Sequence, residues 1–347
     1  MTSNIEKAFR WVIHRLPIWG TLLIILLGLS GSLAVLTGMS QGWLNQVSLI
    51  SSRFAAVFLG IFIEAVPFLL IGTIASGLVE EFVSSEGLME WFPRNKMLAA
   101  GLGGLLGLFF PVCECGVIPF GRRLLRKGLP LSAGITAMLA VPVVNPVVMA
   151  STYAAFGSGL VFWGRIALTL LIAVSVGVIL SYYPGFTNQF EYRNQSASIS
   201  VIPESKPSPS QMRERVTRML RIAVDEFFEM GRYLVVGALI AALSQTFISQ
   251  STLTQIGSGP VLSVFSLQVT AFLLSICSTV DSFIALVFTG TFTSGSILGF
   301  LVFGPMVDIK SVLMYIRVFD KKFVFLLVIM TFIMTLVMGS LINFFEL

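Results

Sequence analysis

Long apolar segments recur along the whole chain, and they constrain its fold more than any other feature. They lie at residues 17–37, 53–79, 97–120, 130–156, 160–182, 222–247, 261–289, 296–316 and 323–344. A helix needs about 20 apolar residues to cross the hydrocarbon core of a bilayer. Of the 347 residues, 56% are hydrophobic and 11% are charged, a composition that excludes a soluble globular domain. The sequence therefore predicts an all-α, polytopic membrane protein.

One polar stretch divides these segments into two groups. Residues 183–221 are rich in Ser, Pro and Arg, which is typical of a flexible loop on the cytoplasmic side. We divide the chain into a tail with an extra transmembrane helix (1–52), a first transmembrane repeat (53–182), the linker (183–221) and a second repeat (222–347). The segment at 17–37 is too long for a signal-peptide core, and we expect it to be retained as a helix.

The two groups of segments resemble each other. The aligned pairs are Glu64 with Glu229, Gly72 with Gly237, Cys113 with Cys277, Pro142 with Pro305 and Asn145 with Asp308, all at shifts of 163 to 165 residues. Shared apolar residues carry little information in a membrane protein. Polar residues, cysteines and prolines in the same order at nearly constant spacing predict an internal duplication.

Basic residues in the short loops indicate how the two repeats are oriented. If each segment crosses once, the basic N-terminal tail and the loop at 121–128 lie on opposite faces, as do the linker and the loop at 317–322. Cytoplasmic loops carry an excess of Lys and Arg. All four clusters lie inside if 97–127 and 261–295 are re-entrant hairpins, and the two repeats are then inverted. An arrangement with nine full crossings is the alternative.

A broken helix is predicted in the stretch from Phe110 to Phe120, read as FPVCECGVIPF. Proline removes a backbone donor and clashes with a continuing helix, so Pro111, Gly116 and Pro119 predict a break inside the membrane. Irregular backbone at that depth is tolerated only where it is buried in protein or lines a cavity. We expect this break to form one wall of a substrate site.

Three cysteines are the candidate ligands of that site. Cys113 and Cys115 lie at the break, and Cys277 takes the corresponding position in the second repeat. A single buried Cys is often only a small apolar side chain, but three at matching breaks predict a convergent site. Soft sulfur ligands suit trivalent arsenic or a soft metal ion. The same thiols could exchange disulfides instead.

Acidic residues within or beside the apolar segments are also candidates, because an ionisable group in a membrane is costly and often functional. They are Glu64, Glu114, Glu229, Asp281 and Asp308. Glu114 lies between the two thiols, and Asp281 shares a helix face with Cys277; we assign both to substrate binding. Glu64, Glu229 and Asp308 are candidates for proton coupling. The alternative for Glu64 and Glu229 is structural, as caps or as ion-pair partners of Arg232 or Lys310.

A second break is predicted at VPVVNPVV, residues 141–148. Pro142 and Pro146 free backbone carbonyls there, and Asn145 adds an amide that can donate and accept hydrogen bonds. Pro305 occupies the matching place in the second repeat. These residues complete the predicted site, and a simple helix kink is the alternative.

Several functional classes are disfavoured by what the sequence lacks. The only histidine, His14, lies in the N-terminal tail, so a Cys nucleophile would have no histidine base nearby. No GxxxxGK[ST] segment is present, and we expect no cofactor and no enzymatic activity. The net charge of +5 comes from the loop clusters and gives no sign of a nucleic-acid partner. Expected partners are membrane lipid and a small solute, and a homo-oligomer is compatible with the sequence.

The stretches PVCECGVIPFGRRLLRKGLP, VPVVNPVV and CSTVDSFIA resemble the predicted-permease family that includes methylarsenite efflux permeases of the ArsP type. The resemblance runs from about residue 53 to the C-terminus. It implies a multi-pass inner-membrane protein that extrudes trivalent arsenicals, with membrane cysteines in recognition. Carried over by motif position, the site residues are Cys113, Cys115 and Cys277, with Asn145 and Asp281 as neighbours. Glu114 between the thiols can change the substrate.

Taken together, these features predict a secondary transporter that exports a small thiophilic solute across a bacterial plasma membrane, with its N-terminus and linker in the cytoplasm. Three competing classes stay open. They are a membrane thiol–disulfide redox protein, a permease for an unrelated small solute, and a channel-like or scaffolding membrane protein.

Overall fold

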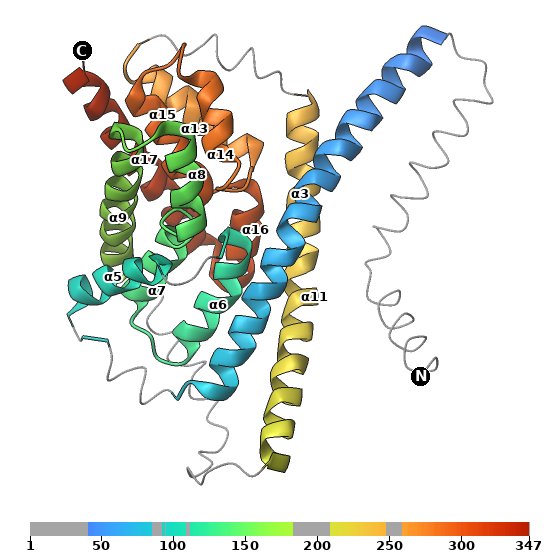
Figure 1. Ribbon diagram of the computed structural model, residues 1–347, viewed down its shortest axis with the longest axis vertical. Coiled ribbons are helices and arrows are strands. Elements are labelled where there is room, and N and C mark those ends of the chain that lie inside the picture. The colour runs from blue at the N-terminus through green and yellow to red at the C-terminus, as the bar shows by residue number, and fades with distance from the viewer. Residues whose placement is uncertain are drawn as a thin grey trace. The chain divides into compact units, whose positions relative to one another are not determined.

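Every regular element that the structure describes is a helix, which confirms the all-α part of the predicted fold class (Figure 1). The structure is a computed structural model that describes residues 41–84, 92–93, 95–108, 112–182, 209–247 and 259–346. The predicted extra helix at 17–37, the first part of the linker and Pro111 lie outside these residues. Residues from Ala56 onward form one compact unit.

Five helical stretches within the described ranges are long and apolar enough to cross a membrane. They belong to α3 (Gln41–Phe82), α9 (Leu160–Leu180), α11 (Pro209–Phe247), α15 (Ser294–Met306) with its continuation α16 (Ile309–Val318), and α17 (Lys321–Glu346). Their length and composition support the prediction of a multi-pass membrane protein.

Shorter helices make up most of the remaining apolar segments. They are α5 (Lys96–Leu105) with the 3-10 turn η1 (Leu106–Leu108), α6 (Glu114–Arg126), α7 (Leu131–Ala140), α8 (Pro146–Phe156), α13 (Leu262–Leu274), and α14 (Asp281–Ala285) with η2 (Leu286–Phe288). None of them reaches the length of a full span. The apolar segments at 97–120, 130–156 and 261–289 are therefore interrupted helices, and the span at 294–318 has a shorter interruption between α15 and α16.

The interruptions have local causes. Asn145 caps α8 by accepting hydrogen bonds from the amides of Val147 and Val148, and Pro146 occupies the first helical position, where its missing N–H costs nothing. Ser275 ends α13 in the left-handed conformation, at φ 46°. These ends release the chain for a new helix at a different angle.

The break near the first two cysteines differs from the sequence prediction. Residues 112–113 have no regular structure, and α6 then runs without interruption through Gly116 and Pro119. Pro305 likewise lies within the last turn of α15, whereas Pro142 lies in the turn between α7 and α8. Gly116 instead allows close packing, because a Cβ atom on Gly72 of α3 would lie 2.3 Å from the Cα atom of Gly116.

The linker also differs from expectation, since α11 begins at Pro209 while the sequence predicts a loop up to residue 221. The arginines in the last part of the linker, Arg213, Arg215, Arg218 and Arg221, therefore lie on a largely exposed helical extension and not on a loop. Few apolar residues surround these arginines in the sequence, so a hydropathy criterion places the start of the helix after them.

Helices pack in the same order in both halves of the compact unit. In the first half α5 packs on α7 and α7 on α9; in the second half α13 packs on α15 and α15 on α17. Contacts also cross between the halves, with α6 against α16 and α14 against α8. α6 follows Cys113, and α16 lies directly after the proline-containing end of α15. In the same way α14 follows Cys277, and α8 begins at Pro146.

Candidate functional site

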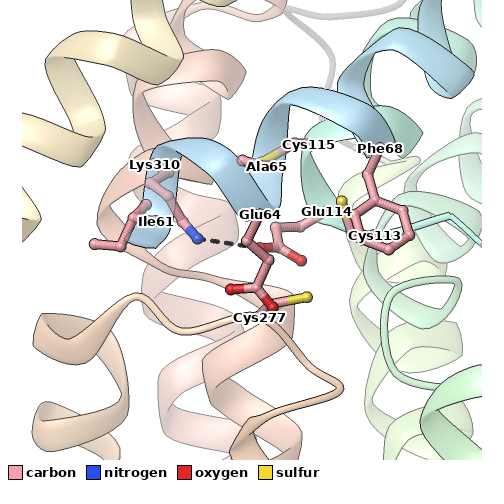
Figure 2. Close-up of a pocket in the computed structure, with 9 residues that line it drawn as sticks. All are labelled: Ile61, Glu64, Ala65, Phe68, Cys113, Glu114, Cys115, Cys277 and Lys310. Carbon is pink, nitrogen blue, oxygen red and sulfur yellow. Dashed lines mark hydrogen bonds and ion pairs between the residues drawn. The ribbon is translucent and has the colours of Figure 1, made fainter. Parts of the chain in front are cut away.

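A small pocket lies where four parts of the chain meet (Figure 2). Its lining residues are Ile61, Glu64, Ala65 and Phe68 of α3, Cys113, Glu114 and Cys115 at the start of α6, Cys277 between α13 and α14, and Lys310 of α16. The pocket encloses about 10 Å³, close to the room that one water molecule needs. Only a single water-sized species fits in this conformation.

The structure brings all three cysteines to this pocket as free, buried thiols. Cys113 caps α6, and Cys115 lies in its first turn. The Thr279 hydroxyl donates a hydrogen bond of 3.5 Å to the sulfur of Cys277. Within the described part of the chain, no three Cys, His, Asp or Glu side chains lie close enough together to hold a metal ion. The thiols therefore share a pocket but are not arranged around a common centre.

A buried cation lies among them. The Lys310 ammonium lies 3.3 Å from Glu114 Oε1 and 3.3 Å from Asp308 Oδ2, and at most 2% of each of these three residues is exposed. Charges at this depth must be paired, because desolvation of a lone charge is very costly. Glu114 Oε2 has no hydrogen-bond partner in the described structure. Asp308 Oδ2 likewise makes no hydrogen bond there, so hydrogen bonding is incomplete at both carboxylates.

Local structure holds Lys310 in place. Asp308 caps α16 in a capping box, with its carboxylate accepting from the amide of Ser311 at 2.7 Å and the Ser311 hydroxyl accepting from the amide of Asp308 at 2.9 Å. On the other side, Gly237 of α11 lets the two helices approach closely, because a Cβ atom there would lie 2.8 Å from the Cα atom of Lys310. The backbone of Lys310 is thus held from both sides.

Glu64 is the remaining ionisable group in the pocket. It lies on α3, is partly buried, and makes no hydrogen bond or ion pair with any described residue. Glu229, which aligns with Glu64 in the sequence, has different surroundings. It lies outside the pocket and is paired with two arginines.

Asn145 and Asp281, both predicted as substrate ligands, do not line the pocket. Asn145 is occupied by the cap of α8 and by a bond from its amide to the Val141 carbonyl at 3.2 Å. Asp281 forms a bidentate pair with Arg165 of α9, at 2.7 Å and 3.1 Å, and all of these groups are buried. The same guanidinium contacts the hydroxyls of Thr152 and Ser282 at 2.9 Å and 2.8 Å.

Arg165 and Lys310 therefore carry three buried ion pairs, with Asp281, Glu114 and Asp308, and neither base is among the site residues predicted from the sequence. A signal was present, since each is a single basic residue inside an apolar segment, at 160–182 and 296–316. Asp281 and Glu114 are not readable from spacing as partners, because each lies more than 100 residues from its base, whereas Asp308 is two residues from Lys310.

Glu229, a predicted coupling residue, belongs to an ion-pair network outside the pocket. It lies 3.3 Å from Arg122 of α6 and 2.7 Å from Arg317 of α16. The network continues through further contacts of α3, α6 and α11: Arg123 with Glu80 and Glu226, Ser76 with Glu226, and Arg218 with Glu81. The stretch at 121–128, predicted as a loop, therefore forms the C-terminal end of α6 and the turn after it, and its arginines are paired with acids.

Lys127 closes this end of α3. Its ammonium donates hydrogen bonds to the carbonyls of Glu80 and Val83, at 2.5 Å and 2.6 Å. Burial lowers the pKa of Lys127, and the carboxylates of Glu80 and Glu81 oppose that shift. The lysine satisfies carbonyls that the helix end would otherwise leave without a partner.

Known proteins resemble this chain over most of its length. A family described as "Predicted permease" matches residues 51–344. The UPF0718 protein YcgR of Bacillus subtilis (strain 168) is 46% identical over 289 residues, which cover 82% of this chain and 95% of that protein. A protein of Streptococcus mutans serotype c (strain ATCC 700610 / UA159), named "Putative two-component membrane permease complex subunit", is 35% identical over 269 residues, 78% of this chain and 88% of that protein.

No solved structure matches the chain. The matched region contains three of the candidate membrane spans whole, most of the first and the last, and every residue of the pocket. The chain belongs to the predicted permease family, and it is a multi-pass membrane protein.

Proposed function

We propose that this permease is a secondary transporter that moves a small thiophilic solute, such as a trivalent arsenical or a soft metal ion, through the pocket of Figure 2. The observation that carries the proposal is the meeting of Cys113, Cys115 and Cys277 at one buried pocket. Two of these thiols come from the first half of the chain and one from the second. A site shared between halves is suited to alternating access, in which one half moves against the other.

The chemistry of thiols supports this class of solute. Sulfur ligands select soft centres over hard ions such as Mg²⁺ or Ca²⁺. A trivalent arsenical with two hydroxyl groups can form two As–S bonds with two thiols, and each bond releases one water made from the hydroxyl and the thiol proton. A soft metal ion would release the thiol protons to solvent. Both reactions are reversible and need no oxidant.

We further propose that the two halves are inverted repeats, with 97–127 and 261–295 as re-entrant hairpins. The repeated packing order of the helices and the crossed contacts of α6 with α16 and α14 with α8 support this arrangement. It directs the basic clusters to the cytoplasm of a bacterial cell, together with the N-terminus and the linker. Export of the solute is the expected direction.

Coupling to protons is proposed at Glu64, because this carboxylate lies in the pocket without a partner in the described structure. Asp308 contributes by holding Lys310. Glu229, held by two arginines, fits better as part of a closure on the side of the basic loops.

The name of the Streptococcus mutans relative concerns a complex of two components. We propose that the present chain also works with a second membrane component. Affinity purification of the full chain from its native membrane, with identification of the co-purifying protein, tests this. Recovery of the chain alone from intact membranes would contradict it.

Solute binding tests the central proposal. Purified full-length protein is titrated with methylarsenite and with Cd²⁺, and the wild type is compared with Cys113→Ser, Cys115→Ser and Cys277→Ser. We expect each variant to lose at least about tenfold in affinity for the bound solute, since it removes one soft ligand. Ser132→Ala is the matched control, because this buried hydroxyl lies outside the pocket and has no hydrogen-bond partner in the described structure.

Two results would overturn the proposal. One is a wild-type protein that binds neither probe, which would leave a permease for an unrelated solute. The other is a mixed disulfide between Cys113 or Cys115 and a partner protein under trapping conditions, which would indicate thiol–disulfide exchange instead.

A further inference from the structure

Carboxylates outnumber cations around the pocket. Glu64 and Glu114 line it, Asp308 contacts Lys310 directly, and Lys310 is the one cation among these four groups. Thiols are neutral in their protonated form. Counted as ionised, the four groups leave an excess of two negative charges, and all but Glu64 are buried where bulk water screens charge little. Such a pocket favours a cation over a neutral or anionic solute.

Glu114 offers a free ligand atom. Its Oε1 is engaged by the Lys310 ammonium at 3.3 Å, while Oε2 is buried and has no hydrogen-bond partner in the described structure. Figure 2 shows the Glu114 carboxylate between the Lys310 ammonium and the thiols of Cys113 and Cys277. Buried carboxylate oxygens are nearly always partnered, so an unpartnered one at a pocket points to a ligand.

The size of the pocket limits what the ligand can be. About 10 Å³ holds one water-sized species, and an arsenical with an organic substituent would require Phe68 or another wall to move. A single desolvated ion fits without that movement. The thiols, however, do not converge on a common centre, so a bound ion must draw them together.

Lys310 is placed to control this step. Its ammonium sits on the carboxylate that lies nearest the thiols in sequence, and it has a second carboxylate, Asp308, to which it is already bound at 3.3 Å. Its backbone is held by the cap of α16 and by the close approach of α11. The side chain can therefore leave Glu114 without becoming an unpaired charge.

We infer that the solute is a soft cation and that Lys310 is the tethered cation that holds Glu114 until the solute displaces it. This inference rests on the proposed function. On binding, each thiol that becomes a thiolate ligand releases one proton to solvent, and the Lys310 ammonium keeps its proton and stays on Asp308. The other titratable groups that line the pocket with Lys310 are Cys113, Cys115, Cys277 and Glu64.

A charge test separates this role from a purely structural one. Cd²⁺ and the neutral compound methylarsenite are titrated into the full-length wild type and Lys310→Gln, whose amide can still donate hydrogen bonds to both carboxylates. We expect Cd²⁺ to bind at least about tenfold more tightly to the variant, because a like charge at a few ångströms has been removed. Methylarsenite affinity should stay within about twofold, because it carries no charge. Lys321→Gln, an exposed lysine at the start of α17, is the matched control.

Glu114→Gln and Lys310→Arg provide a second route if Lys310→Gln does not fold. The first should weaken Cd²⁺ binding while methylarsenite binding is kept, and the second should retain the affinity of the wild type for Cd²⁺. Equal Cd²⁺ affinity in Lys310→Gln and wild type, or equal changes for both probes, would overturn the inference. A wild type that binds methylarsenite but not Cd²⁺ would overturn it as well, while the proposed function would stand. If the wild type binds neither probe, the proposed function itself fails.

Discussion

Two of the buried ion pairs, Asp281 with Arg165 and Glu114 with Lys310, are built from the same chemistry but differ in how many bonds reach the carboxylate. In each, an acid at the first residue of a short helix meets a base from the other half of the chain: Glu114 of α6 with Lys310, and Asp281 of α14 with Arg165. Arg165 makes two bonds to the carboxylate of Asp281, and nearby hydroxyls surround it. Lys310 makes one contact of 3.3 Å with Glu114, at a pocket lined by thiols.

The difference follows from the two cations. A guanidinium is a planar fork that matches a carboxylate in two bonds, whereas an ammonium is a compact point charge on a flexible chain. A buried polar network that is nearly satisfied stiffens the structure, and one with an unmade bond is open to a ligand. We therefore expect Arg165 to govern stability and the Lys310 pocket to govern transport.

The largest effect on stability is expected for Arg165→Leu. Removal of one partner leaves the Asp281 charge buried without compensation, which costs about 3–5 kcal/mol. Thermal unfolding of the purified protein in detergent measures the loss. The double variant with Asp281→Leu should recover much of it, because no lone charge remains. An Arg165→Leu variant as stable as the wild type would show that the Arg165–Asp281 pair does not govern stability.

Gly72→Ala should have the next largest effect, and it bears on the pocket through the backbone. The added Cβ atom would lie 2.3 Å from the Cα atom of Gly116, so α3 and α6 must separate. Overpacking of this kind costs about 1–3 kcal/mol, and it displaces the turn that carries Cys113 and Cys115. Unfolding and Cd²⁺ titration measure both effects.

Gly60→Ala is the matched control on the same helix, because nothing lies within 4 Å of its added Cβ atom. It should retain the stability and binding of the wild type. Similar losses in both variants would mean that α3 responds to any change in helix sequence, and the contact with Gly116 would not be special.

Arg317→Gln removes one of the two partners of Glu229, and a small effect is expected. The arginine side chain is 46% exposed, and ion pairs of this kind contribute about 0–1 kcal/mol because water and salt screen them. Unfolding at low and high salt measures the difference, which should shrink as salt rises. A loss of stability as large as that of Arg165→Leu would mean that the exposed pair of Arg317 with Glu229 stabilises the fold as much as the buried one.

Glu64→Gln should have the smallest effect on stability, within about 0.5 kcal/mol, because the carboxylate has no partner in the described structure. Its effect should appear in transport. Uptake into inverted vesicles driven by a pH gradient should fall, while binding to purified protein is kept. Undiminished, pH-dependent uptake would exclude Glu64 as the coupling residue and weaken the assignment of transport to the pocket.

Some of the site could be predicted because it depends on spacing along the chain. The shift that aligns Cys113 with Cys277 predicts that the two thiols take matching places, and the structure puts both at one pocket. The same alignment failed to predict the surroundings of Glu64 and Glu229, since one lies in the pocket and the other between two arginines. Spacing along the chain predicts where a residue's backbone lies in the fold, but it does not predict which side chains from other helices face that residue.

Pro119 and Asn145 show a second limit. Proline inside an apolar run predicts a break, yet α6 passes through Pro119 after beginning at Glu114. Asn145 was predicted as a ligand because an amide inside a membrane needs hydrogen-bond partners. Its partners are backbone groups of its own turn, the Val141 carbonyl and the Val148 amide. Local hydrogen bonds compete with function for the same polar groups, and only geometry decides between them.

The sequence by itself determined that the chain is a helical membrane protein of the permease family. Long apolar segments cannot leave backbone groups unpaired in lipid, so helices follow from composition alone. The tertiary structure alone decided which acid meets which base, because Glu114 and Lys310 are 196 residues apart and Arg165 and Asp281 are 116 apart. Charges buried together must be paired at a few ångströms, and such distances are set only when helices from both halves pack.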